Sequence, residues 1–383
     1  MTIPLSLYIH FPWCVKKCPY CDFNSYELGD KNLEDVYIQA LKDDLEIEAQ
    51  LQGKKRELHS IFMGGGTPSL FSSNAIAKVL SGIDRIFTIN GDTEITLEAN
   101  PGTLKLSLDN EKFQGFFDAG VNRISIGVQS FNDRHLQSLG RIHSGRDAHN
   151  AFYAAREAGF TNINLDLMHG LPDQNADEAM QDLDTAISLG SEHLSWYQLT
   201  IERNTYFHKY PPLLPDDDRL WDITEKGLSL LAANDFKRYE ISAFAKLGYE
   251  CKHNNNYWSF GDYLGVGAGA HGKISRSHEG HFEIYRTTKT RSPTDYLASP
   301  NRQQSLIQAD SMVLEFLMNA LRLNSGFSPS LFEQRTGLSF DSIAGFVTRG
   351  IERKLLQSRD SSDLVIPTEL GTRYLDDLLL LTD

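Results

Sequence analysis

The chain has 383 residues, of which 40% are hydrophobic and 23% charged, and its formal net charge is −14. This composition predicts a globular protein, with one large domain and smaller attachments. The acidic balance argues against a nucleic-acid partner, because a nucleic-acid binder would carry a basic face.

The N-terminal segment, MTIPLSLYIHFPWC, has neither the basic start nor the long apolar core of a secretory signal. The sequence has no uncharged apolar run long enough to cross a bilayer, and so no expected transmembrane segment. We therefore expect a cytoplasmic protein, with peripheral contact to the inner membrane left open through its partners.

Short apolar segments alternate with longer amphipathic ones from residue 5 to about residue 200. The expected strands cover residues 5–10, 60–63, 94–98, 123–128, 162–168 and 193–199. The expected helices between them cover residues 33–51, 73–86, 110–119, 145–158 and 176–189. Repeated strand–helix units predict an α/β fold with a parallel sheet. The pattern fits an incomplete (β/α)6 barrel or an open doubly wound sheet.

Small or polar residues stand at the ends of all six expected strands. They are Cys14, Gly64–Pro68, Glu98 with Asn100, Gln129 with Ser130, Asp166, and Thr200 with Glu202. The carboxyl ends of parallel strands meet at one edge of the sheet, where such folds place their chemistry. We therefore expect a single site at this edge.

The rest of the chain divides into a connecting region and a C-terminal module. A helix is expected at 216–233 and a strand at 238–244, whereas the Asn-, Tyr-, Trp- and Gly-rich stretch 251–272 is expected to be a loop. Helices at 310–323, 328–335 and 340–353, two short strands at 355–357 and 364–366, and a last helix resemble a winged-helix module. The predicted domains are 1–237, 238–300 and 301–383. Because the module has few clustered basic residues, we expect a lid or a protein-docking surface.

Three of the four cysteines are clustered as Cys14-x-x-x-Cys18-x-x-Cys21, and the fourth is Cys251. Three thiolates on a short loop can ligate three irons of a [4Fe–4S] cluster. The next three residues supply no fourth cysteine, so the remaining iron is free to bind the amino and carboxylate groups of S-adenosylmethionine. The alternative is a zinc site with His10 or Cys251 as the fourth ligand.

The segment YIHFPWCVKKCPYCDFNS resembles the radical-SAM superfamily. Within it, the segment is similar to the branch that contains oxygen-independent coproporphyrinogen III oxidase and the HemW haem chaperones, and the resemblance covers nearly the whole chain. It implies a [4Fe–4S] cluster on Cys14, Cys18 and Cys21, with S-adenosylmethionine as a second cofactor.

The same resemblance implies a set of cofactor-binding residues. They are Tyr8, Gly65, Gly66, Thr67, Glu98, Gln129, Arg141, Asp166 and Thr200. The glycine turn would meet the methionine amino group, Tyr8 and Thr200 the adenine, and Glu98 the methionine or ribose end. Arg141 can pair with the methionine carboxylate as a forked donor, while Asp166 or Gln129 can accept from ribose hydroxyls. The alternatives are a tight turn for the glycines, satisfied buried carboxylates, and a structural ion pair for Arg141.

Two features distinguish members of the branch. The oxidase pattern has a further cysteine two residues after Cys21, where this chain has Phe23. The segment His253-Asn-Asn-Asn-Tyr257 matches the HNxxY motif of HemW-like proteins, and histidine and tyrosine are both axial haem ligands. His253 and Tyr257 are therefore the haem candidates, with Cys251 and His271 as competitors; a capping role for His253 is the alternative.

The resemblance implies a haem chaperone that passes haem to respiratory haem proteins without a porphyrin reaction of its own, and membrane-bound acceptors are compatible with it. The alternative function is oxygen-independent coproporphyrinogen III oxidation, and a third is another radical-SAM reaction. A monomer and a haem-linked dimer are both compatible with the sequence.

Overall fold

The structure is a computed structural model that describes residues 3–29, 33–52, 55–103, 109–278, 281–359 and 363–382. Within these residues the centre of the molecule is a twelve-stranded sheet with the order β14-β13-β12-β11-β1-β4-β5-β6-β7-β8-β10-β9. None of the helices in the described part of the chain is both long enough and apolar enough to span a membrane.

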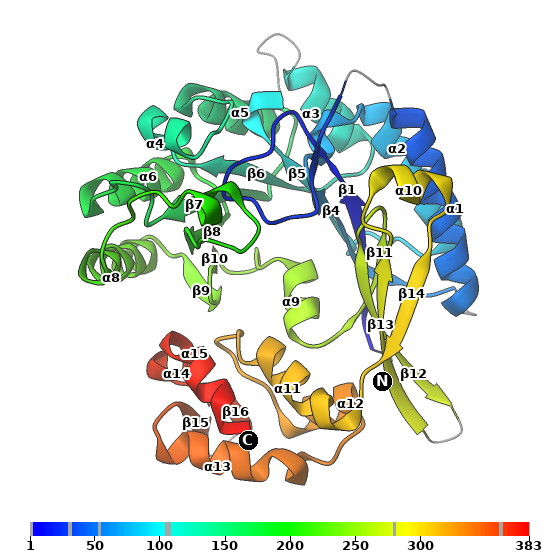
Figure 1. Cartoon of the computed structure of the whole chain (residues 1–383), viewed down its shortest axis with the longest axis vertical. Helices are drawn as coiled ribbons and strands as arrows, with labels where there is room; N and C mark the ends of the chain where they lie inside the picture. Colours follow the sequence, from blue (N-terminus) through cyan, green and yellow to red (C-terminus); the bar gives the residue numbers. More distant parts are fainter. Residues whose placement is uncertain are drawn as a thin grey trace.

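The six strands predicted for the strand–helix units are confirmed, and they lie next to one another as parallel neighbours in the sheet. They are β1 (Leu5–Phe11), β4 (Leu58–Gly65), β5 (Glu94–Ala99), β6 (Arg123–Gln129), β7 (Ile163–His169) and β8 (His193–Gln198). The helices that follow them are α1 (Glu34–Gln52), α2 (Ser73–Ile86), α3 (Asp109–Asp118), α5 (Gly145–Glu157), α6 (Ala176–Leu189) and α8 (Asp217–Ala233). Contacts between α1 and α2, α2 and α3, α3 and α5, and α6 and α8 form an arc outside the sheet, as Figure 1 shows. This arrangement is an incomplete barrel rather than a doubly wound sheet.

Alternate residues of the parallel strands face two different environments, because side chains alternate across a strand. In β7, Ile163, Leu165 and Leu167 are fully buried in the main apolar core. The residues between them, Asn164 and Asp166, belong to a hydrogen-bonded polar network. The barrel therefore has an apolar outer layer beneath the helices and a polar interior.

The expected loop at 251–272 is wrong, because this stretch contains helix α9 (Lys252–Trp258), strand β11 (Asp262–Val266) and the start of β12 (His271–His278). Strand β11 pairs in parallel with β1 and adds a seventh parallel strand. Its sequence, DYLGV, reads as a loop because of its Asp and Gly, yet all five residues are buried. A Cβ on Gly265 would lie 2.0 Å from the carbonyl oxygen of His271, so close packing of the next strand requires this glycine.

Two antiparallel extensions flank the parallel strands. The expected strand at 238–244 is two strands, β9 (Lys237–Glu240) and β10 (Ala243–Ala245), which continue the sheet beyond β8. On the opposite edge, β12, β13 (His281–Lys289) and β14 (Arg302–Leu306) form a meander. The sequence pattern did not reveal this meander. Shorter elements are β2 (Trp13–Cys14), β3 (Tyr26–Glu27), α4 (Asp133–Ser138), α7 (Tyr206–Lys209) and α10 (Pro293–Ala298).

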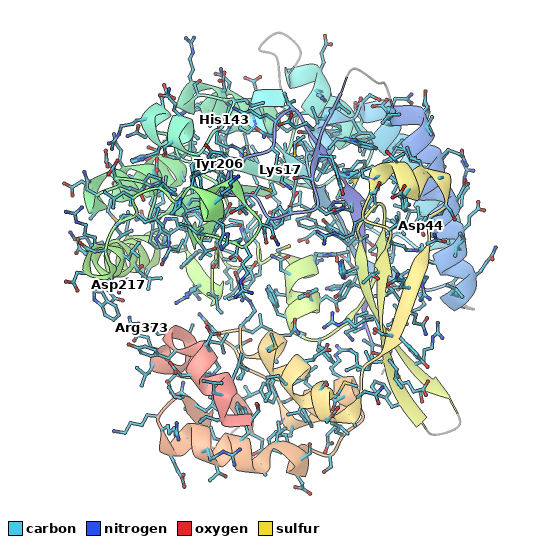
Figure 2. The ribbon with its side chains drawn as sticks, in the orientation of Figure 1. Lys17, Asp44, His143, Tyr206, Asp217 and Arg373 are labelled. Carbon is cyan, nitrogen blue, oxygen red and sulfur yellow. The ribbon has the colours of Figure 1, made fainter. Side chains whose placement is uncertain are left out.

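The C-terminal module has three helices followed by a two-stranded hairpin. They are α11 (Ala309–Ala320), α12 (Pro329–Thr336), α13 (Ala344–Glu352), β15 (Leu356–Arg359) and β16 (Leu364–Pro367), followed by α14 (Glu369–Arg373) and α15 (Leu375–Leu379). Its core is distinct from that of the barrel and includes Phe316 together with Phe260 and Ile284 of the preceding region. Arg373, labelled in Figure 2, bonds Glu225 of α8 at 2.5 Å and stacks on Trp221. The module thus contacts the barrel, and the domain boundaries at 237 and 300 stay predictions.

Candidate cofactor and ligand site

The three clustered cysteines lie on one loop that begins at the carboxyl end of β1. Strand β2 pairs with β3 and closes this loop at its base. The thiols of Cys14, Cys18 and Cys21 line a cavity of about 150 Å³, called here the thiol cavity. The structure therefore brings the three predicted metal ligands to one place.

Polar groups surround the thiols. Thr67 Oγ1 lies 3.5 Å from Cys14 Sγ, and Arg141 Nη1 lies 3.6 Å from Cys18 Sγ. Burial raises the pKa of Cys14 and that of Cys21, since a thiolate is disfavoured away from water. For Cys14, Thr67 and Arg141 lower the pKa in opposition to burial, because they stabilise the thiolate form that ligates metals.

The structure does not place either fourth ligand of the alternative zinc site with the thiols. His10 Nε2 bonds the carbonyl oxygen of Asn24 at 2.8 Å, and its Nδ1 bonds the Tyr8 hydroxyl at 3.0 Å. Cys251 is buried, and its thiol donates to Glu94 Oε1 at 3.4 Å. Among the described residues, no three His, Cys, Asp or Glu side chains converge on a single metal ion. Spaced thiols instead suit a cluster in which each cysteine binds a different iron.

The glycine turn packs so closely against β1 and the thiol loop that only glycine fits at residues 65 and 66. Gly65 ends β4 with φ +109°, and a Cβ on it would lie 2.4 Å from the His10 ring. A Cβ on Gly66 would lie 2.6 Å from the carbonyl oxygen of Trp13. Gly65, Gly66 and Thr67 all line the thiol cavity. The tight turn and the predicted ligand contact are thus compatible at the same residues.

Two carboxyl groups face the thiol cavity from β5 and β7. Glu98 Oε2 accepts the Gly65 N–H at 3.1 Å, and burial, with a smaller contribution from Asp166, raises the pKa of Glu98 to about 8. Asp166 accepts hydrogen bonds from Ser125 Oγ at 3.0 Å and Asn164 Nδ2 at 2.7 Å, and burial raises its pKa as well. These partners show that Asp166 is held largely by side chains rather than by local backbone groups.

Arg141 and Gln129 complete the polar wall of this cavity. Arg141 Nη2 donates to the Gly127 carbonyl at 2.7 Å, while its buried Nε has no partner among the described residues. Within that part of the chain Arg141 pairs with no carboxylate, so the structural ion pair is not found. Gln129 has φ 70° at a bulge that ends β6, and its Oε1 accepts from the Tyr197 hydroxyl at 2.7 Å.

Two predicted cofactor residues lie elsewhere. Tyr8 lines the larger neighbouring cavity, not the thiol cavity. Thr200 is exposed, donates to Glu202 Oε1 at 2.9 Å and lies outside both cavity walls. Sequence reasoning missed Ser125 and Tyr197, which do line the thiol cavity. Their signal was a polar residue at alternate positions of a buried strand.

A second cavity of about 520 Å³ adjoins the first and is called here the aromatic cavity. Rings and other side chains line it, namely Tyr8, His10, Phe23, Asn24, Phe62, His253, Asn254, Tyr257, Trp258, Tyr263, His271 and Arg291. Its volume lies within the range of about 300–1,000 Å³ that is usual for small-molecule sites. The aromatic and thiol cavities share Phe23, Gly65 and Glu98. A ligand in one would therefore lie next to a ligand in the other.

His253 is held in the form that can ligate a metal. The ring is 8% exposed, and burial lowers its pKa to about 3, so the imidazole is neutral. Its Nδ1 lies 3.0 Å from the hydroxyl of Ser60, which itself donates to Ser6. Since the Ser60 proton points to Ser6, Ser60 accepts from Nδ1–H, and Nε2 retains its lone pair. Metal-bound histidines are commonly oriented by such a bond to the second nitrogen.

Glu94 of β5 fixes the helix that carries His253. Its carboxylate accepts the backbone N–H groups of Lys252 at 3.0 Å and His253 at 3.2 Å. The competing ligand Cys251 does not line the aromatic cavity, and burial raises its pKa to about 12. Tyr257 and the exposed His271 do line it. The structure thus brings three of the four haem-ligand candidates to one cavity.

Comparisons with known proteins agree with this geometry. The model of the radical SAM superfamily matches residues 8–186, and that of the HemN C-terminal domain matches residues 307–362. The chain is 47% identical to the heme chaperone HemW of Haemophilus influenzae and 48% identical to that of Escherichia coli, in each case over 98% of this chain and 97% of the relative. The structure of coproporphyrinogen III oxidase (HemN) from Escherichia coli has a TM-score of 0.80, over 100% of this chain and 90% of that one, at 23% identity. That likeness shows a shared fold.

Proposed function

The chain belongs to the HemW heme chaperone family of the radical SAM superfamily, and from this premise we propose that it binds haem in the aromatic cavity and passes it to respiratory haem proteins. Superfamily membership implies a [4Fe–4S] cluster and S-adenosylmethionine as cofactors. The observation that carries the proposal is that His253, whose Nδ1 is hydrogen-bonded to Ser60, lines an aromatic cavity that adjoins the cavity of the three thiols.

The residues of the thiol cavity fit the implied cofactors. Three thiols on one loop supply cluster ligands without a fourth, and the buried, unpartnered Nε of Arg141 supplies a donor for a carboxylate. In this proposal Cys14, Cys18 and Cys21 hold the cluster. The residues that hold S-adenosylmethionine are Gly65, Gly66, Thr67, Glu98, Gln129, Arg141 and Asp166. When bound, the two cofactors supply one-electron radical chemistry.

The chain's own residues would bind and orient the haem. His253, held by Ser60 and by the Glu94 cap of α9, would bind the haem iron. Trp258, on which Arg322 of the C-terminal module stacks at 4.3 Å, offers a ring to the porphyrin face. Because Glu98 lies in both cavity walls, its side chain would link the occupancy of the thiol cavity to the binding of haem in the aromatic cavity.

Phe23 favours a carrier over an oxidase. This side chain is 62% exposed and lines both cavities. An apolar ring there adds surface for a porphyrin but offers no thiol for proton or electron transfer. Under the oxidase alternative, coproporphyrinogen III would have to be oxidised without a thiol at this position.

An anaerobic assay of the reconstituted protein tests the proposal. The protein is titrated with haem and, separately, incubated with coproporphyrinogen III, S-adenosylmethionine and a reductant. We expect stoichiometric haem binding and no protoporphyrinogen. Turnover to protoporphyrinogen would show that Phe23 is no barrier and would assign the chain to the oxidase reaction.

A further inference from the structure

A third cavity, of about 230 Å³, lies beside the aromatic cavity and is called here the cationic cavity. Lys17, Arg203 and Arg291 carry positive charge in its wall, against one carboxylate from Asp22. The whole chain has a net charge of −14, so the positive charge around this small cavity is opposite in sign to that of the chain as a whole. Such a local concentration of one sign favours an anionic ligand.

The two arginines are available to a ligand. Both are exposed, and within the described part of the chain neither guanidinium forms a hydrogen bond or an ion pair. Lys17, on the thiol loop (Figure 2), is different, because its Nζ donates to the carbonyls of Phe23 at 3.0 Å and Ser25 at 3.2 Å. An unpaired guanidinium is a planar, forked donor that matches a carboxylate.

Arg291 lines both the cationic and the aromatic cavity, as do Phe23 and Asn24. Its backbone is fixed at this border, since the Arg291 carbonyl accepts from Asn24 Nδ2 at 2.9 Å and from the Tyr26 hydroxyl at 3.3 Å. These bonds tie the segment between β13 and α10 to the thiol loop. A ligand that fills the aromatic cavity would therefore have one edge at the cationic cavity.

Haem has an apolar macrocycle with two propionate carboxylates on one edge, which matches an aromatic cavity with a cationic cavity at its border. We propose that the cationic cavity binds the propionates of the haem whose macrocycle occupies the aromatic cavity, with Arg203 and Arg291 as the carboxylate-binding residues. The inference rests on the proposed function and deepens it. It also fixes the orientation of the haem, since a carboxylate turned toward the aromatic wall would lose its hydrogen bonds.

The test compares haem with haem dimethyl ester, which keeps the macrocycle and iron but lacks the two charges. Both are titrated into the reconstituted full-length protein and into the double variant Arg203→Gln with Arg291→Gln. The matched control is Arg276→Gln, because Arg276 stacks on Tyr285 and lines neither cavity. We expect the double variant to bind haem about 10- to 30-fold more weakly, from two charge-assisted bonds at an exposed site. The Soret maximum should not move, since His253 is untouched.

The ester separates this inference from a general loss of structure. It should bind the wild type about as weakly as haem binds the double variant, and the two substitutions should not weaken it further. Equal wild-type affinity for haem and ester would overturn the inference while the proposed function stood. Equal losses of haem and ester in the double variant would also overturn it. If the wild type bound neither, the proposed function would fail and this inference with it.

Discussion

Replacing Glu98 with glutamine should stabilise the cofactor-free protein, and the gain should grow as the pH rises. Burial and Asp166 raise the pKa of Glu98 from 4.5 to about 8. Between these two pH values the unfolded chain loses the proton while the folded protein keeps it, so the free energy of unfolding falls as the pH rises and levels off above about 8. Glutamine keeps an acceptor for the Gly65 N–H but does not ionise.

The size of the effect follows from the pKa. One pKa unit corresponds to about 1.4 kcal/mol, so the interval from pH 6 to pH 8 carries at most about 2.7 kcal/mol. Because Glu98 lines two cavities, water screens part of this, and we expect the advantage of Glu98→Gln to grow by about 1–2 kcal/mol between pH 6 and pH 8.5.

Urea unfolding of the cluster-free protein at these two pH values, followed by tryptophan fluorescence, measures the difference. The control is Glu352→Gln, an exposed position on α13 that should show no pH-dependent change. A Glu98→Gln advantage that stayed constant with pH would refute the reasoning. Glu98 would then ionise in the folded protein at the same pH as in the unfolded chain.

Two further sets of variants test the cluster assignment and the anchoring of α9. Replacing Cys14, Cys18 and Cys21 together with alanine should abolish the broad iron–sulfur absorption and the iron content of anaerobically reconstituted protein, whereas Cys251→Ala should preserve both; unchanged iron in the triple variant would contradict the cluster assignment. Glu94→Ala should lower the free energy of unfolding by about 1–3 kcal/mol, because the buried N–H of His253 and the partly buried N–H of Lys252 lose their acceptor. Glu94→Gln, which keeps an acceptor, should lower the free energy of unfolding by less in the same assay. Equal losses for the two variants would show that the hydrogen bonds from α9 to Glu94 do not stabilise the fold.

The parallel core of the barrel was readable from the sequence because its strands are strongly patterned. Apolar residues such as Leu165 and Leu167 recur at every second position, and the intervening helices have caps such as Ser144. The cysteine spacing and the glycine turn were readable for another reason, since they are local. Their residues lie within one loop or one turn and need no knowledge of the rest of the fold.

Features that depend on contacts between residues far apart in the sequence could not be predicted from the sequence. Strand β11 is recognised only by its pairing with β1, because its five residues include Asp262 and Gly265. Asp262 is tolerated there because Arg56, more than 200 positions away, pairs with it at 3.0 Å. The separation of the thiol, aromatic and cationic cavities likewise arises from loops that approach only after folding, as with Arg291 and Asn24.

The most direct test of the central claim is a haem titration of the reconstituted protein in which His253→Ala is compared with His271→Ala. Both side chains line the aromatic cavity, but only His253 is buried with its Nδ1 hydrogen-bonded. We predict a displaced Soret band and weaker haem binding for His253→Ala, and a wild-type spectrum for His271→Ala. An unchanged Soret band and affinity for His253→Ala would contradict the account.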